Sequence, residues 1–128
     1  MASERAEVVA TRHMVVAGHQ LAASAAFSVL EAGGNAIDAG VAGGLALGIL
    51  ESDLVSVAGV APIMVYSADA QKVITVSGLG WWPKAADIGH FRREYGGAIP
   101  NGVLRTVVPA APDAWITALE LWGRMSFG

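Results

Sequence analysis

Residues 33–50 read Gly33-Gly-Asn-Ala-Ile-Asp-Ala-Gly-Val-Ala-Gly-Gly-Leu-Ala-Leu-Gly-Ile-Leu50, and this stretch decides the fold. Asn35 is a favourable N-cap for a helix, and Asp38, three residues later, is the partner that a capping box requires. The predicted helix, Ile37 to Leu50, is apolar nearly all round and contains four glycines. An interior glycine costs a helix roughly 1 kcal/mol relative to alanine. We therefore expect a fully buried helix whose backbone other elements approach closely.

The stretch before this helix predicts a strand and an amphipathic helix. Met14-Val-Val-Ala17 is a short apolar run that ends at Gly18, as a strand would. From His19 to Ala32, polar residues recur every three or four positions, which is the solvated face of a helix. The glycines at 33 and 34 follow its last turn and predict its end.

After the central helix, the chain predicts a hairpin, a loop, two helices and one more strand. Two β-rich runs, at 62–66 and 72–76, are separated by five residues rich in Ser and Asp, a pattern typical of a hairpin. The later segments are a loop at 78–83, an amphipathic helix at 85–95, an alternating strand at 102–108 and a helix at 113–122. The order β-α-α-β-β-α-β-α indicates an α/β protein of stacked layers.

The composition is unusually apolar. The 128 residues are 54% apolar and 15% charged, whereas roughly a quarter of an average soluble domain is charged. A membrane segment, an obligate partner or a larger parent protein would each explain the excess. The longest uncharged helical run, residues 39–50, is shorter than the roughly 20 residues that cross a bilayer, so we expect no membrane association. Eight basic residues against 11 acidic ones, a net charge of -3, give no reason to expect a nucleic-acid partner.

The two ends of the chain lead to expectations about its organisation. Residues 1–13 are polar and predict a flexible N-terminus, and residues 14–128 predict one partial domain. The first seven residues carry two acids where a signal peptide has basic residues, which favours a cytoplasmic location. Ser126 stands where a further helix would be capped, so we expect a domain that is truncated at its C-terminus.

Residue types exclude several kinds of site. The chain has no cysteine, and its three histidines, His13, His19 and His90, lack metal-ligand spacing, so we expect neither a disulfide nor a metal. The glycine runs at 33–36 and 78–80 match neither phosphate-binding fingerprint, so we expect no nucleotide cofactor. Ser24 and Ser28 fall on a helix face, outside any G-x-S-x-G elbow.

Two polar residues have both a structural and a catalytic interpretation. His19 opens a helix, where a neutral imidazole either caps the helix or acts in catalysis. Asp38 stands at the start of the central helix, where it either caps the helix, stabilised by the dipole, or acts as a general base.

The pair Trp81-Trp82 also has two interpretations. It either packs in a core or interface, or forms the aromatic wall of a ligand pocket, held in a loop by adjacent glycine and proline. Lys84 and Arg105 either face water or bind the carboxylate of a ligand.

Three segments, read together, carry a family resemblance. They are Gly18-His-Gln-Leu-Ala-Ala23, Leu30-Glu-Ala-Gly-Gly-Asn-Ala-Ile-Asp-Ala39 and Ala46-Leu-Gly-Ile-Leu-Glu51. Ile63-Met-Val-Tyr66, and the run from Val108-Pro109 to Trp122-Gly123, extend the match. From about residue 14 onward the chain resembles the γ-glutamyltransferase (γ-glutamyltranspeptidase) family, most specifically in the block at 33–39.

The resemblance implies an N-terminal-nucleophile hydrolase with a four-layer αββα fold, made as a proenzyme that cuts itself in two. A threonine exposed by the cut attacks a γ-glutamyl amide, with its own α-amine as base, and the acyl group passes to water or an acceptor amine. That threonine lies downstream of this chain, so we expect no catalytic residue here and no activity from the chain alone. The implied partners are a small-molecule amide and the remainder of the large and small subunits.

One family motif is changed in this chain. Where transpeptidases have Arg-Glu-Thr-Ala-Pro, whose arginine binds the glutamate α-carboxylate, this chain reads Leu79-Gly-Trp-Trp-Pro83. Leucine cannot make the charge-assisted, bidentate contact that arginine makes with a carboxylate. We therefore expect a divergent amidase or acylase of another acyl group, with Leu79, Trp81 and Trp82 lining its substrate pocket.

The alternative is a non-enzymatic interaction module that buries its apolar faces against a partner chain. The two hypotheses explain the apolar excess differently. In an αββα sandwich, the 37–50 helix and the hairpin are interior layers, whereas in a module they form the binding face. A reading frame that continues to an internal threonine favours the enzyme.

Overall fold

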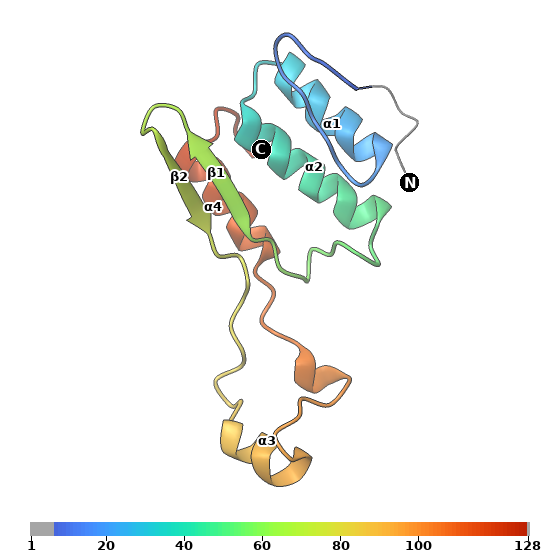
Figure 1. The fold of residues 1–128 in the computed structure, drawn as a ribbon, viewed down its shortest axis with the longest axis vertical. Helices are drawn as coiled ribbons and strands as arrows, with labels where there is room; N and C mark the ends of the chain where they lie inside the picture. Colours follow the sequence, from blue (N-terminus) through green and yellow to red (C-terminus); the bar gives the residue numbers. More distant parts are fainter. Residues whose placement is uncertain (1–6, 128) are drawn as a thin grey trace.

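The computed structural model describes residues 7–127, which form a layered body and a protruding arm (Figure 1). In the body, α1 (Gln20–Glu31) lies along α2 (Ala36–Leu50), and α2 also contacts α4 (Ala111–Trp122). An antiparallel hairpin of β1 (Ile63–Ser67) and β2 (Lys72–Val76) lies beside α4. The arm carries α3 (Ile88–Tyr95) and a 3-10 turn, η1 (Val103–Arg105). The mixed α/β class is confirmed.

Side-chain caps determine where the first two helices begin. His19 precedes α1, and its Nδ1 accepts a hydrogen bond from the Leu21 N–H at 3.1 Å. Asn35 precedes α2, and its Oδ1 accepts from the N–H groups of Ile37 and Asp38. The Asp38 carboxylate accepts in return from the Asn35 N–H at 2.7 Å. The predicted capping box is confirmed, and His19 takes its capping role.

Two of the four glycines in α2 let other helices come close. A Cβ on Gly43 would lie 3.4 Å from the Cβ of Ala26 in α1, and one on Gly44 would lie 3.1 Å from the indole nitrogen of Trp115 in α4. A Cβ on Gly40 would have no atom of another element within 4 Å. Close approach therefore explains Gly43 and Gly44, but the prediction of a fully buried helix is wrong for this chain, because the side of Gly40 is open.

The core lies between α2, α4 and the hairpin. Its buried members are Val41, Ala111, Trp115 and Ala118, and Ile63 of β1 packs against them. The strands pair from Ile63 opposite Val76 to Ser67 opposite Lys72, so the predicted hairpin is confirmed.

Large apolar side chains remain exposed on the body. They lie on all the elements of the body, among them Phe27 of α1, Ile49 of α2, Met64 of β1, Val73 of β2 and Leu121 of α4. No helix of residues 7–127 is both long enough and apolar enough to cross a membrane.

The arm leaves the body after β2 and returns to it before α4. The N–H of Val108 donates to the carbonyl of Trp81 at 2.8 Å, which ties the outgoing and returning segments together. Asp87 caps α3, and Gly96, in the left-handed conformation, ends it. The predicted helix therefore begins at 88 instead of 85, whereas the last helix begins at Ala111 instead of Asp113.

Two predicted strands are wrong. Met14–Ala17 is extended and alternates in exposure, but its backbone makes no hydrogen bond to other described residues. At 102–108, Gly102 has a φ of +107° and begins a turn, which η1 continues. Apolar alternation makes a strand only beside a partner strand, and the described chain offers none to either segment. The observed order is α-α-β-β-α-η-α.

The N-terminal stretch of 1–13, predicted to be flexible, falls partly outside the described residues, which begin at 7. At the end of this stretch, Arg12 and His13 contact Glu31 of α1 at 2.7 and 2.9 Å. These two contacts join the stretch to the body.

Candidate functional site

The three residues that are predicted to line the substrate pocket lie on the loop from Gly78 to Pro83, where the arm joins the body. Gly78 and Gly80 have φ values of +52° and +71°. A Cβ on Gly78 would overlap the carbonyl oxygen of Ala61, and one on Gly80 would overlap that of Val108. Glycine is therefore required at both positions. The carbonyl of Gly78 accepts from the Ala61 N–H at 2.8 Å, which fixes the loop against the body.

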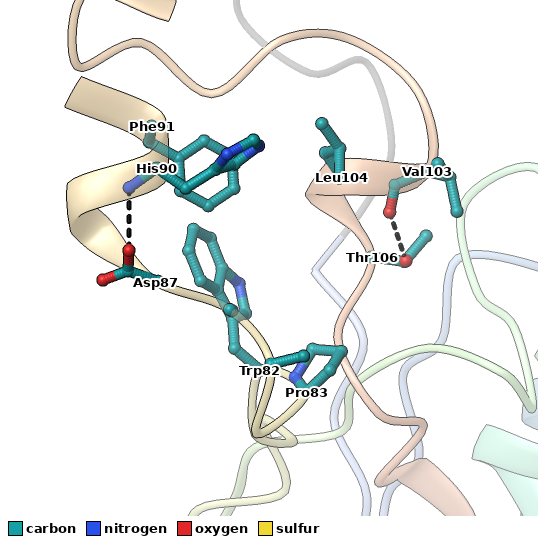
Figure 2. A pocket seen from close by; sticks show the side chains of 10 residues that line it. Trp82, Pro83, Asp87, His90, Phe91, Val103, Leu104 and Thr106 are labelled. Atoms are coloured by element: carbon teal, nitrogen blue, oxygen red, sulfur yellow. Dashed lines mark hydrogen bonds between the residues drawn. The ribbon is translucent and has the colours of Figure 1, made fainter. Parts of the chain in front are cut away.

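This loop contributes to two pockets. The first, here called the base pocket, has a volume of 520 Å³ and is lined by Leu79 and Trp81 together with residues of α4. The second, here called the arm pocket, has a volume of 360 Å³ and lies between α3 and η1, with Trp82 in its wall (Figure 2). The structure thus brings Leu79 and Trp81 together and places Trp82 in a separate pocket.

The base pocket presents apolar surface, hydroxyls and one negative charge. Leu79 is 54% exposed and Trp81 is 86% exposed, so both are available to a ligand. Ser77 and Thr117 bring hydroxyl groups, and Asp113 is the one charged residue among the described residues of the lining. Such a lining offers apolar contact to a ligand, and its negative charge disfavours an anion.

Three aromatic side chains, Trp82, His90 and Phe91, form part of the lining of the arm pocket. The indole of Trp82 lies 5.4 Å from the ring of Phe91, centroid to centroid, and Phe91 is buried. The imidazole of His90 lies edge-on to Phe91 at 5.7 Å. Leu104 and Val103 of η1 form the opposite wall (Figure 2).

The two cations that the sequence offers as carboxylate ligands are not in the base pocket. Arg105 donates from Nε and Nη2 to the carbonyl of Ile99, at 3.2 and 3.1 Å, and so stays within the arm. Lys84 is exposed and lies outside the lining.

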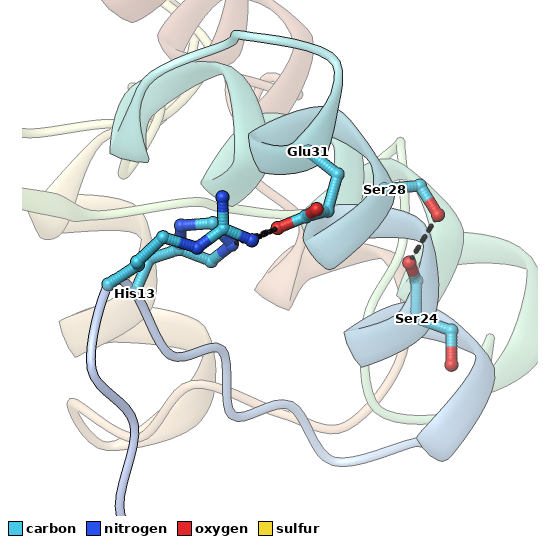
Figure 3. Close-up of polar contacts among 5 residues, drawn as sticks. His13, Ser24, Ser28 and Glu31 are labelled. Carbon is cyan, nitrogen blue, oxygen red and sulfur yellow. Dashed lines mark hydrogen bonds and ion pairs between the residues drawn. The ribbon is translucent and has the colours of Figure 1, made fainter.

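The remaining candidates on α1 have structural roles. The hydroxyls of Ser24 and Ser28 donate to the carbonyls of Gln20 and Ser24, so neither serine is paired with a base in the described chain (Figure 3). His13 contacts Glu31 (Figure 3). Within residues 7–127, no group of three or more His, Asp or Glu side chains could hold a metal ion.

Asp38 joins the start of α2 to the segment after α4. Besides the Asn35 N–H, its carboxylate accepts from the N–H groups of Arg124 and Met125, at 3.1 and 3.2 Å, and the residue is 4% exposed. Burial raises the pKa of Asp38, but the three backbone donors and the charge of Arg124 outweigh burial and lower the pKa below its usual 3.8. Asp38 is therefore a structural anion. Its contacts with residues 124 and 125 are a role that local spacing could not reveal.

Known proteins are similar to this chain in sequence and in fold. The family model described as Gamma-glutamyltranspeptidase matches residues 22–128. The chain is 32% identical over 121 residues to the glutathione hydrolase-like YwrD proenzyme of Bacillus subtilis (strain 168), an alignment that covers 93% of this chain and 23% of that protein. It is 32% identical over 132 residues to the acylase ACY 1 proenzyme of Pseudomonas sp. (strain V22), covering 95% of this chain and 24% of that protein.

The same likeness holds in three dimensions. The chain matches the solved structure of gamma-glutamyltranspeptidase from Pseudomonas nitroreducens complexed with L-DON with a TM-score of 0.80 and 26% identity. That match covers 90% of this chain and 35% of the solved one. The chain spans about a quarter of the length of the curated relatives it matches.

Proposed function

The chain belongs to the gamma-glutamyltranspeptidase family, and from this membership we propose that the full-length protein is an amide hydrolase or acyltransferase for an acyl group other than γ-glutamyl. The names of its relatives support the broad class, because one is a glutathione hydrolase-like proenzyme and another an acylase proenzyme. The proposed acyl specificity depends on residue 79 and the base pocket.

In the proposed reaction, a threonine outside this chain is the nucleophile. Its hydroxyl oxygen attacks the amide carbonyl carbon while its own α-amine takes the hydroxyl proton. The C–N bond then breaks, the leaving amine takes the proton, and the acyl group stays on the threonine as an ester. Water or an acceptor amine then releases the acyl group. This chain contributes binding surface to the reaction and no catalytic group.

The base pocket is the observation that carries the acyl specificity. The family resemblance implies that γ-glutamyl enzymes have an arginine where Leu79 stands here, and that this arginine binds the α-carboxylate. Here a carboxylate would lie beside two apolar side chains, Leu79 and Trp81, with the carboxylate of Asp113 in the same lining and no cation among the described lining residues. A neutral or cationic acyl group avoids that repulsion, and its apolar atoms gain burial against the two side chains.

The apolar faces of the body fit the same proposal. Exposed apolar side chains, such as Ile49 of α2 and Met64 of β1, occur on every element of the body, more than an isolated soluble domain of this size usually exposes. The relatives are about four times as long as this chain, and we propose that the rest of the protein covers these faces. The apolar excess then requires no separate binding module.

The test compares two substrates that differ only in the α-carboxylate, γ-glutamyl-p-nitroanilide and 4-aminobutanoyl-p-nitroanilide. After subtraction of the non-enzymatic rate, we expect the full-length protein to have at least about tenfold higher kcat/KM for the 4-aminobutanoyl substrate. One hydrogen bond to a charged group is worth ~1.5–3 kcal/mol, and tenfold corresponds to ~1.4 kcal/mol. A preference for the γ-glutamyl substrate would refute the proposed specificity.

Variants at residue 79 locate the effect. Leu79→Arg should shift the ratio of the two kcat/KM values toward the γ-glutamyl substrate by about tenfold or more, because it supplies a cation to the pocket. Leu79→Met, which keeps an apolar side chain of similar size, is the matched control and should leave the ratio unchanged. An unchanged ratio in Leu79→Arg would mean that residue 79 does not contact the acyl group.

A further inference from the structure

We propose that the arm pocket is a binding site for a neutral aromatic ring. The site is distinct from the base pocket, because Trp81 lines one and Trp82 the other. It also goes beyond the amide chemistry, since a ring can bind here whatever acyl group the protein transfers.

The walls of the arm pocket suit a flat ligand. The indole of Trp82 is 39% exposed and turns toward the space that Leu104 bounds on the other side (Figure 2). Aromatic rings pack against each other with centroids about 4.5–7 Å apart, and Trp82 and Phe91 already do so at 5.4 Å. A volume of 360 Å³ is at the lower end of small-molecule pockets, enough for one substituted ring.

The pocket also holds a polar group that can orient the ring. The imidazole of His90 touches the rings of Phe91 and Tyr95, and its nitrogens make no hydrogen bond to any other residue in 7–127. An imidazole nitrogen can donate to or accept from a hydroxyl or amide on the ligand. His90 therefore favours a ring that carries such a substituent over a bare hydrocarbon.

The charge in the lining selects against anions. Asp87 is the charged residue of the described lining, and its carboxylate is held in place by the N–H groups of Gly89 and His90, at 3.0 and 2.9 Å. The guanidinium of Arg93 lies 3.8 Å from this carboxylate but is not part of the lining. A ligand carboxylate would therefore add a second negative charge near this fixed carboxylate, whereas a neutral ring would not.

The proposal is tested by binding, in the full-length protein without any acyl donor, with probes that contain no amide bond to be cleaved. Saturation-transfer NMR titrations of benzyl alcohol should give a Kd on the order of 1 mM, the range expected for so small a ligand. Cyclohexylmethanol, which lacks the aromatic ring, and benzoate, which adds the charge, should each bind at least about fivefold more weakly.

Two tryptophan variants form a matched pair. Trp82→Ala should weaken benzyl alcohol at least about tenfold, and Trp81→Ala should change its Kd by less than about twofold, because only Trp82 lines the arm pocket. If Trp82→Ala lowers the Tm, Leu104→Ala replaces it, since this part-exposed residue forms the facing wall and should weaken binding about threefold.

Three results would overturn the proposal: no saturable binding of benzyl alcohol, equal affinity for cyclohexylmethanol, or a loss on Trp81→Ala as large as on Trp82→Ala. The substrate comparison at residue 79 has an independent outcome. A preference for the γ-glutamyl substrate with benzyl alcohol still bound at Trp82 would remove the proposed specificity and leave this site in place.

Discussion

Replacing Asp38 by Asn should loosen the joint between α2 and the segment after α4. The substitution keeps the size of the side chain but replaces one acceptor oxygen by an NH₂ group. In the structure, Oδ2 accepts from the Asn35 N–H at 2.7 Å and Oδ1 accepts from the Met125 N–H at 3.2 Å. Whichever way the amide of Asn turns, at least one backbone N–H faces a donor.

The magnitude follows from burial. An unsatisfied buried donor costs about 1–3 kcal/mol, and hydrogen bonds to an ionised acceptor are stronger than those to a neutral one. With one donor orphaned and the other bonds to Asp38 weakened, we expect a loss of about 3 kcal/mol. This is a large fraction of the ~5–15 kcal/mol that holds a domain together.

Hydrogen exchange followed by mass spectrometry is the assay, because it reports the local loss in the full-length protein. A loss of about 3 kcal/mol corresponds to roughly 100-fold faster exchange of the amides in the first turns of α2. The matched control is Asp87→Asn. Asp87 also caps a helix with both carboxylate oxygens, but its side chain is 60% exposed, so water replaces what the variant loses.

Exchange at the start of α2 that rises less than about threefold in Asp38→Asn would refute the reasoning, as would an equal effect at α3 in Asp87→Asn.

Acidification gives a second check of the role of Asp38. Because the pKa of folded Asp38 lies below the ordinary value of 3.8, its contribution is complete above that value and is lost as the pH falls through the folded pKa. Protection of α2 should therefore drop with acid in the wild type and less steeply in Asp38→Asn.

Three further predictions concern other contacts. Gly80→Ala should destabilise the full-length protein by about 2 kcal/mol or more, because the new Cβ would overlap the Val108 carbonyl. Gly97→Ala should cost only about 1 kcal/mol, because φ is +86° there but no atom lies within 4 Å of the new Cβ, and equal Tm shifts for the two variants would contradict this. Glu31→Gln should lower the free energy of unfolding by less than about 1 kcal/mol and speed proteolysis before α1, because Arg12 and His13 lose the carboxylate that they contact. In 1 M salt the variant and the wild type should be cleaved equally fast, and equal cleavage at low salt would contradict the prediction. The isolated chain should bind a hydrophobic dye and melt without a sharp transition, whereas a cooperative melt of a monomer would show that its apolar faces need no cover.

Local signals in the sequence predicted the local parts of the fold. The capping box at Asn35, the end of α1 before Gly33 and the 62–76 hairpin each depend on residues within a few positions of one another, and all three are present. The predicted strand at Met14–Ala17 is absent because a strand needs a partner segment, and residues 14–17 do not specify which segment that is. The prediction that α2 is fully buried is wrong for a similar reason. The hydrophobic pattern indicates which side chains are apolar, but not whether the described chain contains the elements that pack against them.

The candidate site was predictable only in part. The loop at 78–83 was predictable because its glycines, tryptophans and proline lie between a predicted hairpin and a predicted helix. Which pocket each side chain enters depends on the backbone path of the folded loop, in which the neighbouring residues Trp81 and Trp82 line different pockets. The link from Asp38 to Arg124 joins residues 86 positions apart, and no pattern along the chain records it.

The hydrogen bond between Val108 and Trp81 makes the arm an insertion with a closed root. The first and last residues of the arm lie side by side, so the distance between the two points where the arm joins the body does not depend on the residues in between. The entropy of closing such a loop changes by only about 0.6 kcal/mol when its length doubles. We therefore expect that arms of different length or sequence can replace this one between Trp81 and Val108 while α4 and the hairpin stay in place.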